Sequence, residues 1–251
     1  MGVVNSFVGK VLRKAARVID PPPAIRRVDD EYITWLCYAN PGMLERGNLY
    51  SIDYAISHLP SAAPILEIGT FCGLSTNVIS HFKRKHGVHN PLITCDKWDF
   101  ENVNGRSTIA DSPVLFSEYR AFSKESYVRN IKMFSRDDLP FTFEMTANEF
   151  FDAWKERHVC ADVLGRSFSL GGPFSFCYID GNHTYEYARQ DFLHCDSYLD
   201  VGGFILFDDS TLPEFSLYKL MPEVMALERY RLITANPYHL FQKIQPAPQK
   251  T

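Results

Sequence analysis

The stretch Pro64-Ile65-Leu66-Glu67-Ile68-Gly69-Thr70-Phe71-Cys72-Gly73-Leu74-Ser75 decides the fold of this chain. Its first five residues form a short apolar run typical of a buried strand, and a helical pattern follows to about Lys85. Gly69 and Gly73 let the backbone turn sharply and approach a ligand closely. Strand, glycine turn and helix in this order are typical of nucleotide-binding α/β proteins, although the glycine spacing alone also fits a nucleoside site or a purely structural turn.

Apolar runs on both sides of this stretch alternate with helical segments. Helices are predicted over 31–38 and 49–59, and strands over 64–68, 91–95, 141–145, 174–179 and 203–207. Two late strands, 230–234 and 238–244, are joined by only three residues, which is too short for a parallel crossover and predicts an antiparallel hairpin. The predicted fold class is α/β, a Rossmann-like three-layer sandwich with a mostly parallel seven-stranded sheet and this C-terminal hairpin.

The size and composition of the chain predict one main globular domain. They do not indicate a nucleic-acid-binding or membrane-spanning protein. The chain has 251 residues, of which 45% are hydrophobic and 22% charged, and no apolar run approaches the roughly 20 residues of a membrane span. A net charge of −4 gives no general attraction to phosphate backbones, so no nucleic-acid partner is expected. The six cysteines are scattered without a CxxC pair, which favours reduced, structural thiols and a cytoplasmic protein.

The two ends of the chain differ from the central domain, predicted over 29–245. Residues 1–28 predict an N-terminal helical extension, a basic amphipathic helix over 1–19 followed by a proline-rich linker. This helix is expected to pack on the domain or on a second subunit of a homo-oligomer, with peripheral contact to a membrane surface as the alternative. Residues 246–251 are expected to form a disordered tail.

Acidic residues lie where several of the predicted strands end, and these ends form the ligand-binding edge of an open α/β sheet. Glu67 precedes the glycine turn, and Asp96 ends the second strand. An acid at the second position can accept hydrogen bonds from two ribose hydroxyls, or it can cap a following helix.

The densest group of polar residues follows the fourth and fifth strands. Asp180, Asp208 and Asp209 are expected to converge at one edge of the sheet, where a cation would offset their mutual repulsion unless they only cap turns and helices. Oxygen ligands favour Mg²⁺, Mn²⁺ or Ca²⁺ over zinc. His183 is placed to take a proton from a substrate hydroxyl, although a lone histidine is more often structural.

Three motifs together resemble the family of metal-dependent small-molecule O-methyltransferases, and in particular the macrocin and mycinamicin O-methyltransferases and the cephalosporin-hydroxylase-like proteins. They are Glu67-Ile68-Gly69-Thr70, Asp180-Gly181-Asn182-His183-Thr184-Tyr185 and Gly202-Gly203-Phe204-Ile205-Leu206-Phe207-Asp208-Asp209. The resemblance spans about residues 42 to 244 and implies a class I methyltransferase that uses S-adenosylmethionine and a divalent ion such as Mg²⁺.

The resemblance also implies a role for each matching residue. The cofactor is expected to contact Glu67, Gly69, Thr70, Gly73, Ser75, Asp96, Asn148 and Asp180. Asp96 would hold the ribose, and the region from Thr146 to Asn148 would lie near the adenine. The metal ligands would be Asp180, Asp208 and Asp209, with His183 as the catalytic base. Many relatives carry an acid at the position of Asn182, so in this chain the proton transfer falls to His183.

The implied reaction is direct methyl transfer to a hydroxyl of a small molecule, and two neighbouring hydroxyls, as in a sugar diol or a catechol, would chelate the ion best. The aromatic-rich stretch 98–127 is long for a strand-to-helix connection, so it predicts a loop over the substrate or a packing segment. Two alternatives stay open: a Rossmann-like enzyme of other chemistry, such as a hydroxylase-like one, and an inactive binding or interaction module.

Overall fold

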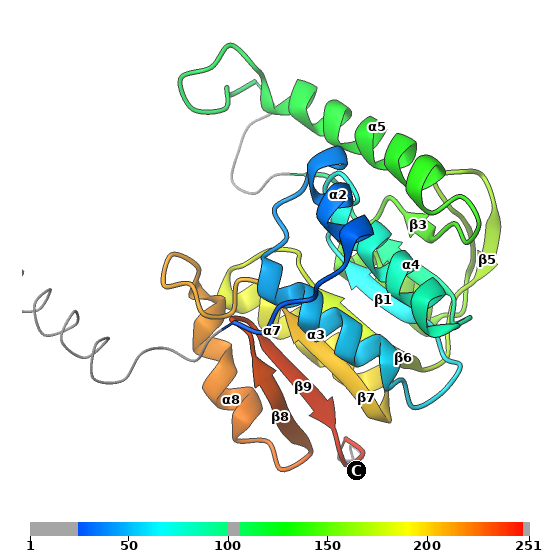
Figure 1. Cartoon of the computed structure of the whole chain (residues 1–251), viewed down its shortest axis with the longest axis vertical. Helices are drawn as coiled ribbons and strands as arrows, with labels where there is room; N and C mark the ends of the chain where they lie inside the picture. Colours follow the sequence, from blue (N-terminus) through cyan, green and yellow to red (C-terminus); the bar gives the residue numbers. More distant parts are fainter. Residues whose placement is uncertain (1–24, 100–105, 248–251) are drawn as a thin grey trace, which may run out of the picture.

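A seven-stranded sheet forms the centre of the molecule in the computed structural model, which describes residues 25–99 and 106–247 (Figure 1). The strand order is β3-β2-β1-β6-β7-β9-β8. The predicted amphipathic helix over 1–19 and most of the predicted tail lie outside the described residues, so both stay predictions.

The strands have the positions and directions that the sequence predicts. Their bounds are β1 Ile65–Ile68, β2 Leu92–Cys95, β3 Phe141–Phe143, β6 Phe174–Ile179, β7 Leu199–Phe207, β8 Tyr230–Ala235 and β9 His239–Lys243. Strands β3, β2, β1, β6 and β7 pair in parallel, while β9 is antiparallel to both of its neighbours, β7 and β8. The predicted Rossmann-like sheet with its C-terminal hairpin is therefore confirmed.

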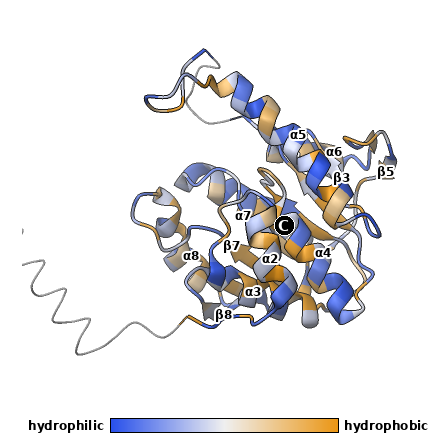
Figure 2. Ribbon diagram, turned by 45° about the horizontal axis from the view of Figure 1, so that its top comes forward, coloured by the Kyte–Doolittle hydropathy of each residue, from blue (hydrophilic) through white to orange (hydrophobic). Residues whose placement is uncertain are grey.

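Helices cover both faces of this sheet and complete the three layers. One face carries α2 Glu31–Ala39, α3 Arg46–Ser57 and α4 Leu74–His86, with α5 Phe116–Phe134 packed beside α4; the other carries α6 Ala147–Lys155, α7 Tyr185–Tyr198, the short 3₁₀ turn η1 Ser216–Leu220 and α8 Met221–Met225. Figure 2 shows that the helices around the sheet carry both polar and apolar residues, as expected where one side of a helix faces a core.

The two larger hydrophobic cores of the described residues result from the alternation of side chains along the strands. Along β6, Phe176 and Tyr178 enter the core beneath α2, α3 and α4, while Cys177 and Ile179 enter the core beneath α6 and α7. Neighbouring side chains point to opposite faces of a strand, so β6, whose six residues are all buried, contributes to both cores.

Two segments differ from the sequence-based expectation. Residues 116–134 form α5, so Phe116, Tyr119 and Phe122 lie on a helix and not in one long loop. The helix begins where Glu118 accepts a hydrogen bond from the backbone N–H of Leu115 at 2.9 Å. A two-stranded hairpin, β4 Val159–Ala161 and β5 Ser167–Ser169, was also not predicted, because each of its strands has only three residues. No helix among the described residues is long and apolar enough to cross a membrane.

Candidate active site

The turn between β1 and α4 lies against the end of β6, and glycine makes this approach possible. Gly69 has φ +82°, and a Cβ at this residue would lie 2.0 Å from the backbone oxygen of Asp180. Gly73, with φ +88°, is the N-cap of α4. Both predicted glycines therefore adopt a left-handed backbone conformation, which is unfavourable for other residues. The contact brings the β1 turn and Asp180 to the same edge of the sheet.

Glu67 is a buried carboxylate with one oxygen left free. Its Oε2 accepts a hydrogen bond from the Thr76 hydroxyl, while Oε1 has no partner among the described residues. The pKa of Glu67 is raised to about 7, mainly by burial and to a smaller extent by the charge of Asp96, while hydrogen bonds from Ser75 and Thr76 lower it. A buried acceptor without a partner is costly, so this oxygen is suited to a donor on a bound ligand.

Asp96 connects the end of β2 to the β1 turn. Its Oδ2 accepts hydrogen bonds from the backbone N–H groups of Thr70 and Phe71 at 2.7 and 3.0 Å, and its Oδ1 accepts one from Trp98 at 2.6 Å. No helix of the described residues begins directly after Asp96, so the helix-cap alternative is wrong. Asp96 is partly exposed at the edge of the sheet, where a ligand can reach it.

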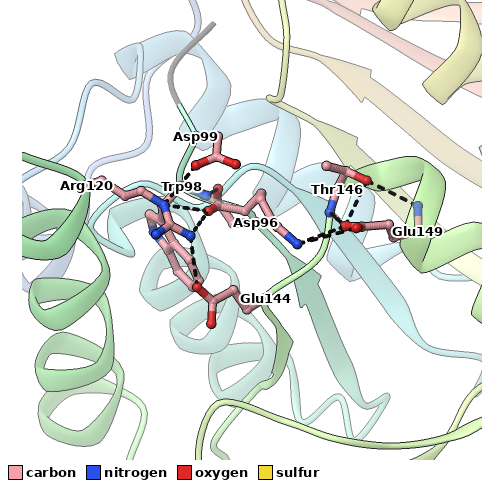
Figure 3. A network of polar contacts seen from close by, with 8 residues as sticks. Asp96, Trp98, Asp99, Arg120, Glu144, Thr146 and Glu149 are labelled. Carbon is pink, nitrogen blue, oxygen red and sulfur yellow. Dashed lines mark hydrogen bonds and ion pairs between the residues drawn. The ribbon is translucent and has the colours of Figure 1, made fainter. Parts of the chain in front are cut away.

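A network of charged residues ties the segments after β2 and β3 together (Figure 3). Arg120 of α5 forms ion pairs with Asp99 at 2.9 Å and with Glu144 at 3.1 Å, and Lys97 pairs with Glu149 of α6 at 3.2 Å. No sequence pattern marks these residues, because their partners come from separate elements. This network holds the segments after β2 and β3 in place beside Asp96.

Asn148 lies on the first turn of α6, and its side chain is directed to α7. Its Oδ1 lies 3.2 Å from Nε2 of His194. Thr146 caps the same helix, since its hydroxyl accepts a hydrogen bond from the backbone N–H of Glu149 at 3.2 Å. The helix start is therefore well defined, while a contact of Asn148 with a cofactor stays a prediction.

Asp180, His183 and Asp208 form a compact cluster at the ends of β6 and β7. One potential ligand atom from each lies within 4.8 Å of the others. Oxygen ligands bind Mg²⁺ or Ca²⁺ at about 2.0–2.6 Å, so atoms bound to one such ion lie at most about 4–5 Å apart. The residue types and spacing therefore fit a shared divalent ion. Asp180 does not cap α7, because Thr184 is the N-cap of that helix.

The charged forms of Asp180 and Asp208 are destabilised in this cluster. The pKa of Asp180 is raised to about 8, mainly by burial and also by the nearby carboxylates of Glu67 and Asp209, whereas a hydrogen bond with Asp208 lowers it. Burial and the charge of Asp180 raise the pKa of Asp208 well above its ordinary value. A proton or a cation must offset this negative charge.

His183 lies between two carboxylates and an aromatic ring. Its Nδ1 is 3.7 Å from Asp209 Oδ2, and its Nε2 is 3.4 Å from Asp180 Oδ1 without a hydrogen bond to any described residue. The Phe215 ring lies 4.8 Å from the imidazole, centroid to centroid. Asp209 is thus near the cluster but outside its compact trio, and a role for it as a metal ligand stays a prediction. Phe215 could not be predicted as part of this site, because no motif marks it.

Two hydrogen bonds hold the loop that carries Phe215 against the His183 loop. The backbone N–H of Leu217 donates to the His183 carbonyl at 3.0 Å, and the N–H of Tyr185 donates to the Ser216 hydroxyl at 2.8 Å. These hydrogen bonds therefore hold the two loops together on one side of the site.

Solved structures of methyltransferases share this fold. The O-methyltransferase from Bacillus cereus in complex with SAH is 12% identical, with 94% of this chain and 97% of that chain covered and a TM-score of 0.53. TomG from Streptomyces achromogenes, an O-methyltransferase in complex with SAM, is 12% identical over 87% and 92%, with a TM-score of 0.51. CalS11, a TDP-rhamnose 3'-O-methyltransferase of calicheamicin biosynthesis, is 16% identical over 94% and 93%, with a TM-score of 0.51.

The sequence itself assigns the family. No curated protein sequence matches the chain significantly. Residues 66–210, more than half of the chain and spanning every motif from Glu67 to Asp209, match the family described as methyltransferase domain. The chain therefore belongs to this methyltransferase family, and it has the fold of the O-methyltransferases.

Proposed function

We propose that this protein transfers the methyl group of S-adenosylmethionine to a hydroxyl of a small molecule, with the help of a divalent ion. The observation that carries this proposal is the cluster of Asp180, His183 and Asp208, which lies at the same sheet edge as the glycine turn of the family motif. The similar structures of the Bacillus cereus enzyme and TomG hold SAH and SAM, which supports the choice of cofactor.

The cofactor would lie along the ends of β1 and β2. Glu67 offers its free Oε1 to the ammonium of the methionine moiety, and the partly exposed Asp96 offers its carboxylate to the ribose. Gly69 and Gly73 allow the left-handed turn that brings the ends of β1 and β6 together beside this ligand. When bound, S-adenosylmethionine supplies an electrophilic methyl group.

The divalent ion would be held by Asp180 and Asp208, with Asp209 close enough to contribute directly or through water. When bound, the ion would lower the pKa of the acceptor hydroxyl and orient it. Mg²⁺ is the first choice and Mn²⁺ a close substitute, because the ligands are carboxylates.

His183 would remove the proton of the acceptor hydroxyl through Nε2, which has no hydrogen-bond partner among the described residues. Loss of this proton would prepare the acceptor oxygen to take the methyl group from S-adenosylmethionine, which would leave as S-adenosylhomocysteine. Asp209, beside Nδ1, would stabilise the protonated imidazole. The loop that carries Phe215, hydrogen-bonded to the His183 loop, restricts the motion of the His183 ring.

Acceptors with two neighbouring hydroxyls suit such an ion site, because both oxygens can chelate one ion. The similarity to CalS11, a TDP-rhamnose 3'-O-methyltransferase, supports a test on sugars. A first panel therefore contains TDP-rhamnose and catechol.

The test is calorimetric binding of S-adenosylmethionine to the full chain, with Mg²⁺ and with chelator, followed by transfer of labelled methyl to the panel. We expect wild-type binding, and Asp96→Ala should weaken it at least about tenfold, since charge-assisted hydrogen bonds contribute about 1.5–3 kcal/mol each. Asp137→Ala, an exposed aspartate after α5, should bind like the wild type. No binding by the wild type would reject the proposal and favour an inactive interaction module.

The pH dependence of cofactor binding tests the role of Glu67. Its raised pKa of about 7 means that the carboxyl becomes protonated as the pH falls below 7, and a protonated carboxyl cannot pair with an ammonium. The dissociation constant should therefore rise about tenfold for each pH unit below 7 and stay level from pH 7 up to the pH at which the ammonium of the ligand loses its proton. Glu67→Gln should bind weakly at every pH. An unchanged pH profile in Glu67→Gln would contradict this role.

A further inference from the structure

The start of helix α3 is fixed against the β8–β9 turn at the edge of the sheet that carries the ion cluster. A Cβ on Gly47 would lie 1.8 Å from the backbone oxygen of Asn236, so the two segments are in direct contact. The Asn236 side chain donates to the Gly47 carbonyl at 3.0 Å and accepts from the Arg26 backbone N–H at 2.7 Å. These contacts determine where the next residue of α3, Asn48, projects.

Asn48 reaches from α3 to the acidic cluster. Its side chain is fully buried, and Nδ2 donates a hydrogen bond to Oδ1 of Asp208, a residue 160 positions later in the chain. The same Nδ2 lies 3.5 Å from the hydroxyl of Tyr178 on β6. The orientation of the amide follows from chemistry, since a carbonyl oxygen turned to the carboxylate would be repelled.

The other end of this amide has no partner. Asn48 Oδ1 is buried and accepts no hydrogen bond from any described residue. A buried amide oxygen in this state needs a donor, which an ordered water or a hydroxyl of a bound ligand supplies. Asn48 is therefore a component of the site rather than of the apolar core around it.

We infer that Asn48 is a positioning residue for ion binding, which would hold the Asp208 carboxylate in the orientation that the ion needs. This inference rests on the proposed ion site. Hydrogen bonds to the carboxylate ligands of a metal fix their orientation, and their loss typically weakens metal affinity by about 10–100-fold. Without Asn48, Asp208 can rotate, and Oδ1 loses its buried donor.

Ser51 provides a matched control for the packing of α3. It lies one turn after Asn48 on the same helix, is equally buried, and its hydroxyl has no hydrogen-bond partner among the described residues. Removing its hydroxyl perturbs the helix without touching Asp208. Ser51→Ala therefore measures how a change in the packing of α3 alone affects Mn²⁺ binding.

The experiment is Mn²⁺ titration of the full chain, followed by calorimetry and by the electron paramagnetic resonance signal of free Mn²⁺. Asn48→Ala and the similarly sized Asn48→Leu should weaken Mn²⁺ binding by about tenfold or more, whereas Ser51→Ala should stay within about twofold of the wild type. Binding of S-adenosylmethionine in chelator should remain unchanged in all three variants, which shows that they are folded.

Four outcomes would overturn the inference. Wild-type Mn²⁺ affinity in both Asn48 variants would show that Asp208 needs no such partner. Equal losses in Ser51→Ala, or a parallel loss of cofactor binding in chelator, would assign Asn48 to helix packing. A wild-type chain that binds the cofactor but no Mn²⁺ would remove the proposed ion site itself, and the inference with it.

Discussion

Asp208→Asn is expected to abolish the binding of divalent ions and to lower methyl transfer by about a thousandfold or more. Asp208 is only 5% exposed and lies within 4.8 Å of the ligand atoms of Asp180 and His183. The substitution keeps the shape of the side chain and removes its charge. Metal ions contribute several kcal/mol to transition states of this kind, and about 1.4 kcal/mol corresponds to tenfold in rate. Mn²⁺ titration and a labelled-methyl assay measure the two effects.

The fold should survive this substitution. Burial raises the pKa of Asp208, which means that the folded state disfavours its charged form in the absence of an ion. A neutral amide removes that cost, so the ion-free variant should melt at or above the wild-type temperature near neutral pH. Asp137→Asn, on the surface, should change neither ion binding nor activity. Ion binding that persists in Asp208→Asn would place the ion elsewhere.

The sheet could be predicted from the sequence because its strands are local patterns. Ile65 to Ile68 is apolar and precedes a glycine turn, and each later strand has its own apolar run. A turn of three residues between 235 and 239 leaves only a hairpin as the connection. In a parallel sheet the ends of neighbouring strands meet at one edge, so Asp180 and Asp208 could be placed together before any coordinates.

The remaining features depend on contacts between distant segments. Asn48 has no motif around it, and only the packing of α3 on the β8–β9 turn brings it to Asp208. Asp96 holds the β1 turn through backbone N–H groups, a role that residue types cannot reveal. The hairpin of β4 and β5 is too short to show an alternating pattern.

The geometry around His183 decides between two roles that the residue type leaves open. His183 belongs to the compact trio, so it can act as a ligand. Its Nε2, 3.4 Å from Asp180 Oδ1, has no hydrogen-bond partner among the described residues, so it can equally accept a proton. Asp209 near Nδ1 favours the second role, because a carboxylate there stabilises a protonated ring.

His183→Gln is therefore expected to lower kcat by about 100- to 10,000-fold, the usual contribution of a general base, while leaving the affinities for Mn²⁺ and S-adenosylmethionine within about threefold. Glutamine retains a polar side chain beside Phe215 but cannot take the hydroxyl proton. Single-turnover methyl transfer and Mn²⁺ titration on the same preparation separate the two roles. If His183→Gln loses Mn²⁺ as completely as Asp208→Asn does, the histidine is a metal ligand, and another group must receive the proton.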